Sequence, residues 1–409
     1  MKNPHTYFCL LAICLFFQSA FGESSDTWDQ FRGPGASAVV PDGQLPDDIS
    51  NDKVLRWKVA LPGEGLSSPV LHGNHVFLTA SSGPEQKTLH VLCFDQSSGK
   101  PVWERTLQAT GRTMCHEKTA VAAPTPVIGA GHIFALFSSN DLVCLDLDGN
   151  LKWLRGLTLD YPNASNSLGM ASSPVFMDGV VVVQIENDSQ SFAAGIDATN
   201  GRNLWMIDRP KAANWTSPVP VKMGDTYSVA LQSSRGVTLV DSVSGREIWD
   251  FTDGASTIPS SVVSGGVLYV PSNGITALSL TGSGAPGSVL WNSRRLRPST
   301  PSPVIASGLI LTVNNAGVIT AASLADGEKQ WDLRLSGPFS ATPLVSGNQL
   351  LFVSEKGVVQ LVEVNASEGK LAGSLDLGEM ILCTPAASAG QVFLRSDNFL
   401  YKLANPLVL

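Results

Sequence analysis

The chain has 409 residues, of which 43% are hydrophobic, only 15% are charged and 38 are glycine. This composition suits many short strands joined by turns. The formal net charge of −8 argues against a nucleic-acid-binding surface, which is normally basic. The length alone suggests two or three domains, but the repeats described below account for nearly the whole chain as one domain.

The first residues have the features of an export signal. Lys2 and His5 precede an apolar run over residues 7–17, and small residues follow up to Gly22. This pattern predicts a signal peptide over residues 1–22 that is cleaved after Gly22, and therefore a periplasmic or secreted protein. The apolar run is too short for a permanent transmembrane helix, so no membrane span is expected.

Lipid attachment at Cys14 is the alternative for this segment, although Ile13 stands where a small residue is expected. After the signal we expect an N-terminal extension over residues 23–53, a single repeat domain over 54–403 and a C-terminal tail over 404–409.

A turn-and-strand motif recurs along the chain, most clearly at Asp241, Gly245 and Trp249. The Asp can accept hydrogen bonds from the turn that it opens, the Gly can supply a positive φ, and the Trp ends the next strand. Successive strand ends are 40 to 52 residues apart, a period typical of solenoids and propellers. The motif tryptophans, which we predict to have a structural docking role, are Trp57, Trp103, Trp153, Trp205, Trp249, Trp291 and Trp331.

A second marker, a Ser or Thr that is usually followed by Pro, runs in step with the first. It occurs eight times, at residues 68, 125, 173, 217, 260, 302, 342 and 384. Each marker is followed by a Gly turn and apolar runs that read as four short strands, or one propeller blade. The last unit has only three strands, so we expect residues 54–60 to complete it and close the ring. The sequence predicts an all-β, eight-bladed β-propeller, with seven blades as the alternative if residues 258–295 do not form a blade.

The Asp-x3-Gly-x3-Trp spacing resembles the repeat of the pyrroloquinoline-quinone (PQQ)-like propeller family. That family includes the quinoprotein alcohol dehydrogenases and BamB, the propeller lipoprotein of the outer-membrane barrel assembly machine. The resemblance covers about residues 54–403, and the stretch from Trp28 to Gly35 is similar to the N-terminal signature of secreted members.

The BamB resemblance implies an exported, non-catalytic scaffold that binds an envelope protein or a polysaccharide. We expect the chain to be a monomer. A PQQ-dependent dehydrogenase is one alternative. It would imply an Asp base, a Ca²⁺ ion held by Glu, Asn and Asp, and commonly two adjacent cysteines. No Cys-Cys pair occurs here, so we expect no cofactor, with PQQ and Ca²⁺ as the remaining possibility. A carbohydrate-binding propeller is the other alternative, although no paired-carboxylate signature supports hydrolysis.

Binding residues are expected on the face that carries the loops between the second and third strands and those between blades. Loop length varies most there, with long loops at 106–121 and 156–170, and long loops on a rigid ring commonly bind partners. The candidates are Arg112, His116, Glu117, Lys118, Asn163, Asn166, Glu186, Asn187, Asp188, Lys211, Asn214, Trp215 and Arg235.

Each chemical interpretation of these residues has a simpler competitor. Cys115, His116 and Glu117 are adjacent and cannot surround one metal ion unaided, so no metal is expected. The Glu186–Asp188 stretch could bind Ca²⁺ through oxygen ligands or could form a solvated turn. Trp215 could stack on a ring ligand or fill the ring axis. Cys93 and Cys144 are expected to pack in the core rather than form a disulfide, and Cys115 and Cys383 have no assigned role.

Overall fold

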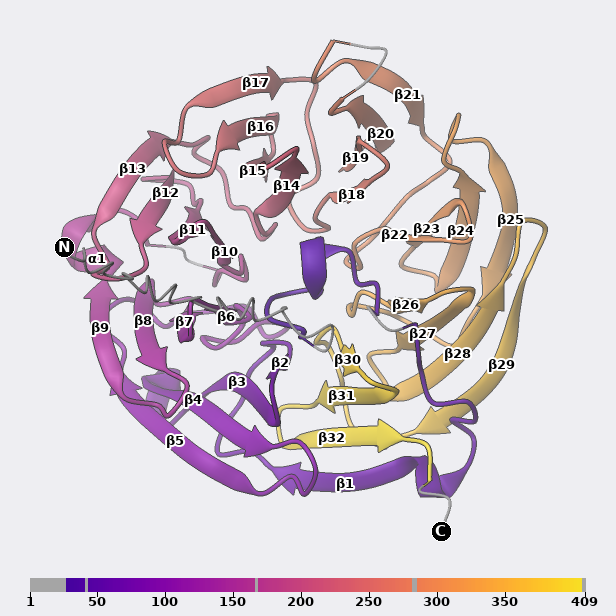
Figure 1. The fold of residues 1–409 in the computed structure, drawn as a ribbon, viewed down its shortest axis with the longest axis horizontal. Helices are drawn as coiled ribbons and strands as arrows, with labels where there is room; N and C mark the ends of the chain where they lie inside the picture. Colours follow the sequence, from indigo (N-terminus) through magenta and orange to yellow (C-terminus); the bar gives the residue numbers. More distant parts are fainter. Residues whose placement is uncertain (1–26, 41–42, 166–167, 282–284, 407–409) are drawn as a thin grey trace, which may run out of the picture.

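The computed structural model describes residues 27–40, 43–165, 168–281 and 285–406. Across these residues, thirty-two strands form eight antiparallel four-stranded sheets that are arranged as a ring around a central channel (Figure 1). The eight-bladed prediction is therefore confirmed, and the seven-bladed alternative is wrong because the 258–295 unit forms a full blade.

The strands of each blade are called A to D from the channel outward. Blades 1 to 4 contain β2(Val70–His72), β3(His75–Ser82), β4(Thr88–Asp95) and β5(Pro101–Gln108); β6(Val127–Gly129), β7(His132–Leu136), β8(Asp141–Asp146) and β9(Leu151–Gly156); β10(Val175–Met177), β11(Val180–Ile185), β12(Phe192–Asp197) and β13(Asn203–Asp208); β14(Val219–Met223), β15(Thr226–Ser233), β16(Gly236–Asp241) and β17(Glu247–Phe251).

Blades 5 to 8 contain β18(Val262–Ser264), β19(Val267–Ser272), β20(Gly274–Ser279) and β21(Val289–Ser293); β22(Val304–Ala306), β23(Leu309–Val313), β24(Val318–Ser323) and β25(Lys329–Arg334); β26(Leu344–Ser346), β27(Gln349–Val353), β28(Val358–Val364) and β29(Gly369–Asp376); β30(Ala386–Ser388), β31(Gln391–Arg395), β32(Phe399–Ala404) and β1(Leu55–Ala60). The helical turns are η1(Pro34–Ala36), η2(Asp52–Val54), η3(Pro84–Gln86) and α1(Leu157–Asp160).

The ring closes because the first strand of the chain completes the last blade. β1 pairs antiparallel with β32, with Trp57 opposite Lys402 and Ala60 opposite Phe399. The two ends of the domain are thus joined by main-chain hydrogen bonds, and blade 8 gains the fourth strand that its own segment lacks.

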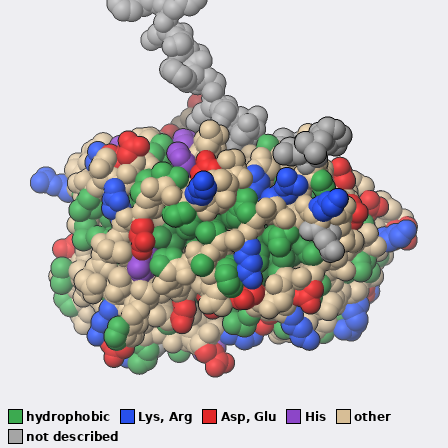
Figure 2. Space-filling view, turned by 90° about the horizontal axis from the view of Figure 1, so that it is seen from below, with side chains coloured by type: hydrophobic (Ala, Val, Ile, Leu, Met, Phe, Trp, Pro, Cys, Tyr) green, Lys and Arg blue, Asp and Glu red, His purple; other side chains and the backbone are tan. Residues whose placement is uncertain are grey.

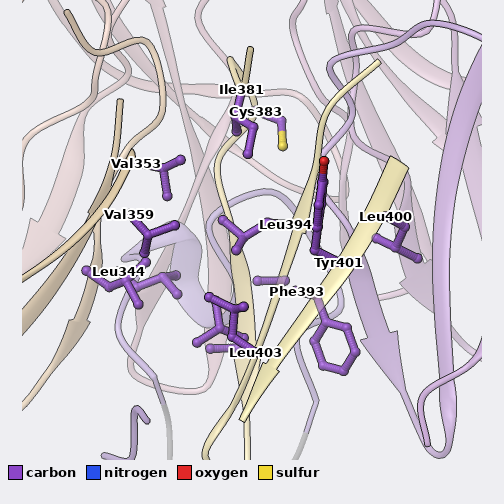
Figure 3. Packing of buried hydrophobic residues seen from close by; sticks show 14 of the residues in the cluster. Leu344, Val353, Val359, Ile381, Cys383, Phe393, Leu394, Leu400, Tyr401 and Leu403 are labelled. Carbon is purple, nitrogen blue, oxygen red and sulfur yellow. The ribbon is translucent and has the colours of Figure 1, made fainter. Parts of the chain in front are cut away.

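The hydrophobic core lies between neighbouring blades. β11 is buried at every position, whereas the outer strand β5 alternates exposed and half-buried residues. Between blades 7 and 8, Leu344 and Val353 pack in one cluster with Phe393 and Leu403, as Figure 3 shows. Cys93, Cys144 and Cys383 are buried free thiols, and burial raises the pKa of Cys93 and of Cys144 to about 12. Figure 2 views the ring from its edge and shows apolar side chains among polar ones on the outer wall.

The recurring turn motif joins each blade to the next. At Asp241 the carboxylate accepts hydrogen bonds from the backbone N–H of Ser244 (2.8 Å) and from its hydroxyl (2.7 Å). Gly245 has φ +68°, and the Trp205 ring of blade 3 lies directly against it. The Trp205 indole N–H donates to the Ser242 carbonyl at 2.9 Å, so this indole is both packed and hydrogen-bonded across the blade boundary.

The Ser/Thr markers form a hydrogen-bonded belt around the channel. The backbone N–H of each marker donates to the hydroxyl of the marker in the next blade, over 2.9 to 3.1 Å, in seven successive steps from Ser68 through Thr125, Ser173, Ser217, Ser260, Ser302 and Thr342 to Thr384. These side chains thus satisfy buried backbone donors that the innermost strands leave unpaired.

The N-terminal extension enters the channel at the end of the ring that carries the A–B and C–D turns, here called the turn face. Trp28 is fully buried and pairs with Leu71, and η1 lies inside the ring of innermost strands (Figure 1). The Arg32 guanidinium is 1% exposed and donates to the Ser261 carbonyl at 2.7 Å, and its burial lowers its pKa to about 9. Residues 27–40, here called the plug, therefore fill part of the channel.

The same extension then covers the one boundary that lacks a tryptophan. Gly373 stands where the repeat places Trp, and Ile49 and Ser50 occupy the space beside it. The Ser50 hydroxyl accepts a hydrogen bond from the Ser374 N–H at 3.2 Å, and Asn405 bonds to Asp47. The boundary between blades 7 and 8 is thus sealed by the extension rather than by an indole.

The predicted signal peptide and Cys14 lie outside the described residues. No helix in the described part of the chain is long and apolar enough to cross a membrane.

Candidate functional site: the loop face

The loop face is the end of the ring that carries the B–C loops and the D–A loops. Three long D–A loops meet there and hold one another. The Trp215 indole N–H donates to the Gly169 carbonyl at 2.9 Å, and the His116 N–H donates to the Leu168 carbonyl at 2.9 Å. Gly169 also lies against Cys115 so closely that an added Cβ would be 2.7 Å from the Cys115 Cβ. Trp215 is therefore part of the loop scaffold.

An ion pair between residues that are distant in the sequence connects these loops to blade 7. Lys118 lies in the first D–A loop, and its Nζ is 3.0 Å from Oε2 of Glu355 in the B–C loop of blade 7. The other oxygen of Glu355 accepts a hydrogen bond from the Ser340 hydroxyl at 2.7 Å. This carboxylate is 13% exposed, so the pair fixes the first loop to a mostly buried group.

Glu186, one of the predicted site residues, lies in a buried polar network. Its Oε1 accepts a hydrogen bond from Arg209 Nε at 2.8 Å, and its Oε2 accepts one from the Asn214 amide at 3.0 Å. Arg209 also donates to the Thr238 hydroxyl and to the Leu231 carbonyl, which links blades 3 and 4. Burial raises the pKa of Glu186, and the charge of Arg209 opposes this shift.

This network does not fit a calcium ion. Both Glu186 oxygens are used, and a guanidinium stands where a cation would need to approach. The Asn187 side chain closes its own turn, because its amide donates to the Gln190 carbonyl and its oxygen accepts from the Ser189 N–H. Of the two interpretations of residues 186–188, the geometry favours the turn, but Glu186 and Asn187 are buried, so the expectation that this turn is solvated is wrong for these two residues. Among the described residues, no three His, Cys, Asp or Glu side chains are grouped to hold a metal.

The other predicted residues fall into two hollows and an exposed rim. Asn163 and Lys211 line a pocket of about 440 Å³ together with Arg209, and Arg112 and Cys115 line another of about 770 Å³. Asn166 lies outside the described residues. The remaining exposed candidates are His116, Glu117, Lys118, Asp188 and Arg235.

Sequence reasoning missed the apolar part of this face. Five large apolar side chains that belong to its D–A loops are 43% to 71% exposed, namely Met114, Leu159, Leu168, Ile258 and Met380. Their loops lack the alternation that marks strand residues, so the only available signal was an apolar residue inside a long polar loop. Apolar side chains that are exposed together on a protein surface are typical of an interaction surface.

A hydrogen-bonded chain of catalytic residue types was also missed. The Ser82 hydroxyl is 2.7 Å from His90 Nε2, and His90 Nδ1 is 2.6 Å from Glu104 Oε1. The three residues come from successive strands β3, β4 and β5 of blade 1. His90 is only 5% exposed, and neither Ser82 nor His90 lines the pockets described here. The arrangement is that of a buried histidine with both ring nitrogens satisfied.

The fold and the turn motif define the class of protein: an eight-bladed propeller built from PQQ-type repeats, with docked tryptophans at the blade boundaries. The family model described as outer membrane protein assembly factor BamB matches residues 48–205, 87–270 and 275–399, so the chain belongs to this family.

The individual relatives are distant. The chain is 25% identical over 195 residues to the outer membrane protein assembly factor BamB of Moranella endobia, a match that covers 44% of this chain and 45% of that protein. The match thus spans less than half the length of that relative.

Solved structures share the fold at low identity. The crystal structure of BamB from Moraxella catarrhalis has a TM-score of 0.62 at 14% identity and covers 86% of this chain and 97% of its own. The quinohemoprotein alcohol dehydrogenase of Comamonas testosteroni has a TM-score of 0.69 at 12% identity. The match covers 94% of this chain and 81% of the dehydrogenase. These likenesses concern the fold alone.

Proposed function

We propose that this chain is an exported, non-catalytic propeller whose loop face binds another protein of the cell envelope. The observation that carries the proposal is the set of five exposed apolar side chains on the D–A loops, four of which lie on loops that are joined by hydrogen bonds. A preorganised surface loses little conformational entropy on binding, so apolar contacts there contribute more fully to affinity.

The charges on this face suit a protein partner. The Arg112 guanidinium lies 3.3 Å from the sulfur of the exposed Met114, Lys118 is exposed in the same loop, and Arg235 and Lys211 are exposed on neighbouring loops. Arginine and methionine are enriched in protein interfaces, and a polar rim around apolar anchors is their usual arrangement. Membership of the BamB family supports an envelope location, which also agrees with the predicted export signal.

A sugar or a quinone is a poorer match. Sugar and ring ligands are commonly held against aromatic faces, whereas the exposed anchors here are Met, Leu and Ile. Trp215, the aromatic candidate of this face, is half-buried and hydrogen-bonded to Gly169. The calcium site that a quinone would need is not formed by Glu186 and Asn187, because Arg209 and the local turn use their polar atoms.

Site-specific photo-crosslinking in the native host envelope tests this proposal. A photoreactive amino acid is placed at Met114 or Leu159, and at two outer-wall positions of similar exposure, Leu204 and Leu151. We expect the two loop-face positions to give adducts with the same envelope protein, and the outer-wall positions to give none with it. Equal adducts from both sets, or adducts with polysaccharide alone, would contradict a protein-binding loop face.

A further inference from the structure

The innermost strands of the propeller have one edge that faces the channel, and the plug pairs with this edge in three blades. Trp28 and Leu71 exchange two N–H to carbonyl hydrogen bonds of 3.0 Å in blade 1. The Ile128 N–H donates to the Asp29 carbonyl at 2.8 Å in blade 2. In blade 7 the Val40 N–H donates to Val345, and the Val345 N–H donates to Ala38. The chain thus uses inner strand edges as peptide-binding edges for its own N-terminal segment.

Phe176 of blade 3 occupies the equivalent position but has no such partner. Leu71 lies opposite Val76, Val345 lies opposite Leu350, and Phe176 lies opposite Val181 in the same register relative to the A–B turn. The Phe176 N–H and carbonyl therefore point into the channel, as those of Leu71 do. No described residue forms a hydrogen bond with either group on that side.

A groove of about 870 Å³ opens on this free edge at the turn face. The plug forms one wall through residues including Asp29 and Pro34, and the inner strands of blades 2 to 5 form the other. Phe176, Pro220 and Val263 provide half-buried apolar surface there. The Phe176 ring is held in place by stacking on Phe134, with centroids 5.7 Å apart and an interplanar angle of 6°.

The polar groups of the groove indicate the kind of ligand. Charged side chains of both signs lie on its walls, where Asp178 and Lys222 are exposed. The groove therefore does not favour a ligand of one particular charge. Its free strand edge instead offers a main-chain donor and acceptor, the pair that recognises an extended peptide by strand addition.

We propose that this groove binds an extended segment of another protein, which pairs with Phe176 as the plug pairs with Leu71 and places an apolar side chain against Phe176 and Val263. Continuity with the plug supports this occupant, because the plug already pairs with the adjacent edges of blades 1 and 2. The surface is separate from the loop face, so the inference stands independently of the proposed function.

The sequence of blade 4 suggests a substitution that tests the backbone donor of Phe176 directly. Blade 4 has Pro220 at the corresponding position after its Ser-Pro marker, so this position accepts a residue without an N–H. Phe176→Pro removes the proposed donor without removing a hydrogen bond within the blade. Ile305→Pro is the matched control, because Ile305 lies opposite Ile310 in the same register in blade 6 and does not line the groove.

The probe is a capped, fluorescein-labelled octapeptide of alternating valine and threonine, measured by fluorescence anisotropy with the full mature chain. We expect saturable binding, about tenfold weaker binding to Phe176→Pro, and unchanged binding to Ile305→Pro. Val263→Arg, which places a long side chain in the groove, should abolish binding and serves as the test if Phe176→Pro fails to fold. A photoreactive version of the peptide should label Met177 or its neighbours.

Absence of binding to the unaltered chain would overturn the proposal. So would equal weakening by Phe176→Pro and Ile305→Pro, or labelling that falls on the loop face.

Discussion

Trp205 of blade 3 packs against Gly245 of blade 4 so closely that a Cβ at position 245 would lie 2.6 Å from the indole ring. Gly245 also has φ +68°, so glycine is required both by the turn and by the neighbouring tryptophan. The same contact recurs at other Asp-x3-Gly turns, for example between Trp153 and Gly201. One residue of the repeat thus sets the turn and the spacing between blades.

Gly245→Ala should destabilise the fold by about 2–4 kcal/mol, because it adds a steric clash with Trp205 to the strain of a positive φ. Gly308→Ala is the matched control. Gly308 has φ +76° but no atom within 4 Å of an added Cβ, so strain alone should cost about 1–2 kcal/mol. Urea denaturation compares the two, and equal losses would show that docking of the indole adds nothing.

The indole hydrogen bond can be separated from the packing. The Trp205 N–H donates to Ser242, whereas the buried Trp249 N–H has no partner among the described residues. Trp205→Phe should therefore cost about 1 kcal/mol more than Trp249→Phe. Trp249→Ala should cost about 3–5 kcal/mol through lost packing, while His116→Ala on the exposed loop should leave the melting temperature unchanged. The reverse order in thermal melts would contradict this division between boundary and loop residues.

The Glu186–Arg209 pair is expected to be structural. Glu186→Gln leaves a 4% exposed guanidinium without its counter-charge and should cost about 3–5 kcal/mol. The control is Arg235→Gln, which breaks an ion pair with Asp250 that is 66% exposed on the arginine side and should cost about 0–1 kcal/mol. Similar unfolding midpoints for the two variants would argue against a structural role for the buried pair.

The turn aspartates should make the stability of the fold depend on pH. Hydrogen bonds from Ser97 and Ser98 lower the pKa of Asp95 to about 2, and those from Ser244 lower the pKa of Asp241. A carboxylate whose folded pKa is depressed stabilises the fold above its ordinary pKa, near 4, and this contribution disappears as the pH falls toward 2.

Asp241→Ala should therefore lower the melting temperature at pH 7, with a difference from the unaltered chain that shrinks as the pH approaches 2. Asp225→Ala, in the exposed β14–β15 turn, is the control and should have little effect at any pH. A difference for Asp241→Ala that is constant from pH 7 to pH 2 would contradict the assigned role of the carboxylate.

The architecture could be predicted because its determinants are local and repeated. The turn Asp, the turn Gly and the strand-end Trp stand at fixed spacing within each blade, so one chain displays the motif several times. Ring closure by residues 54–60 followed from counting strands. The recurring Ser and Thr markers were visible in the sequence. Their hydrogen bonds run between blades, so the belt that they form could not be derived from the spacing.

The candidate site was less accessible, because its chemistry depends on partners that are distant in the sequence. Glu186 and Asn187 have the right residue types for a cation, and only the fold shows that Arg209 neutralises Glu186. Similarly, Arg32 donates a hydrogen bond to the Ser261 carbonyl, 229 residues away in the sequence. The stretch from Trp28 to Gly35 could be recognised in the sequence, but its position in the channel could not be predicted.

The central claim, a binding propeller without a quinone cofactor, is tested most directly by melting the mature protein with PQQ plus Ca²⁺ and, separately, with Ca²⁺ alone. A ligand that binds only the folded state must raise the melting temperature. We predict no shift in either case at saturating ligand, because Arg209 and the 187–190 turn use the polar atoms that the ion would need. A quinone-dependent rise that is lost in Glu186→Gln would contradict the account and support a dehydrogenase.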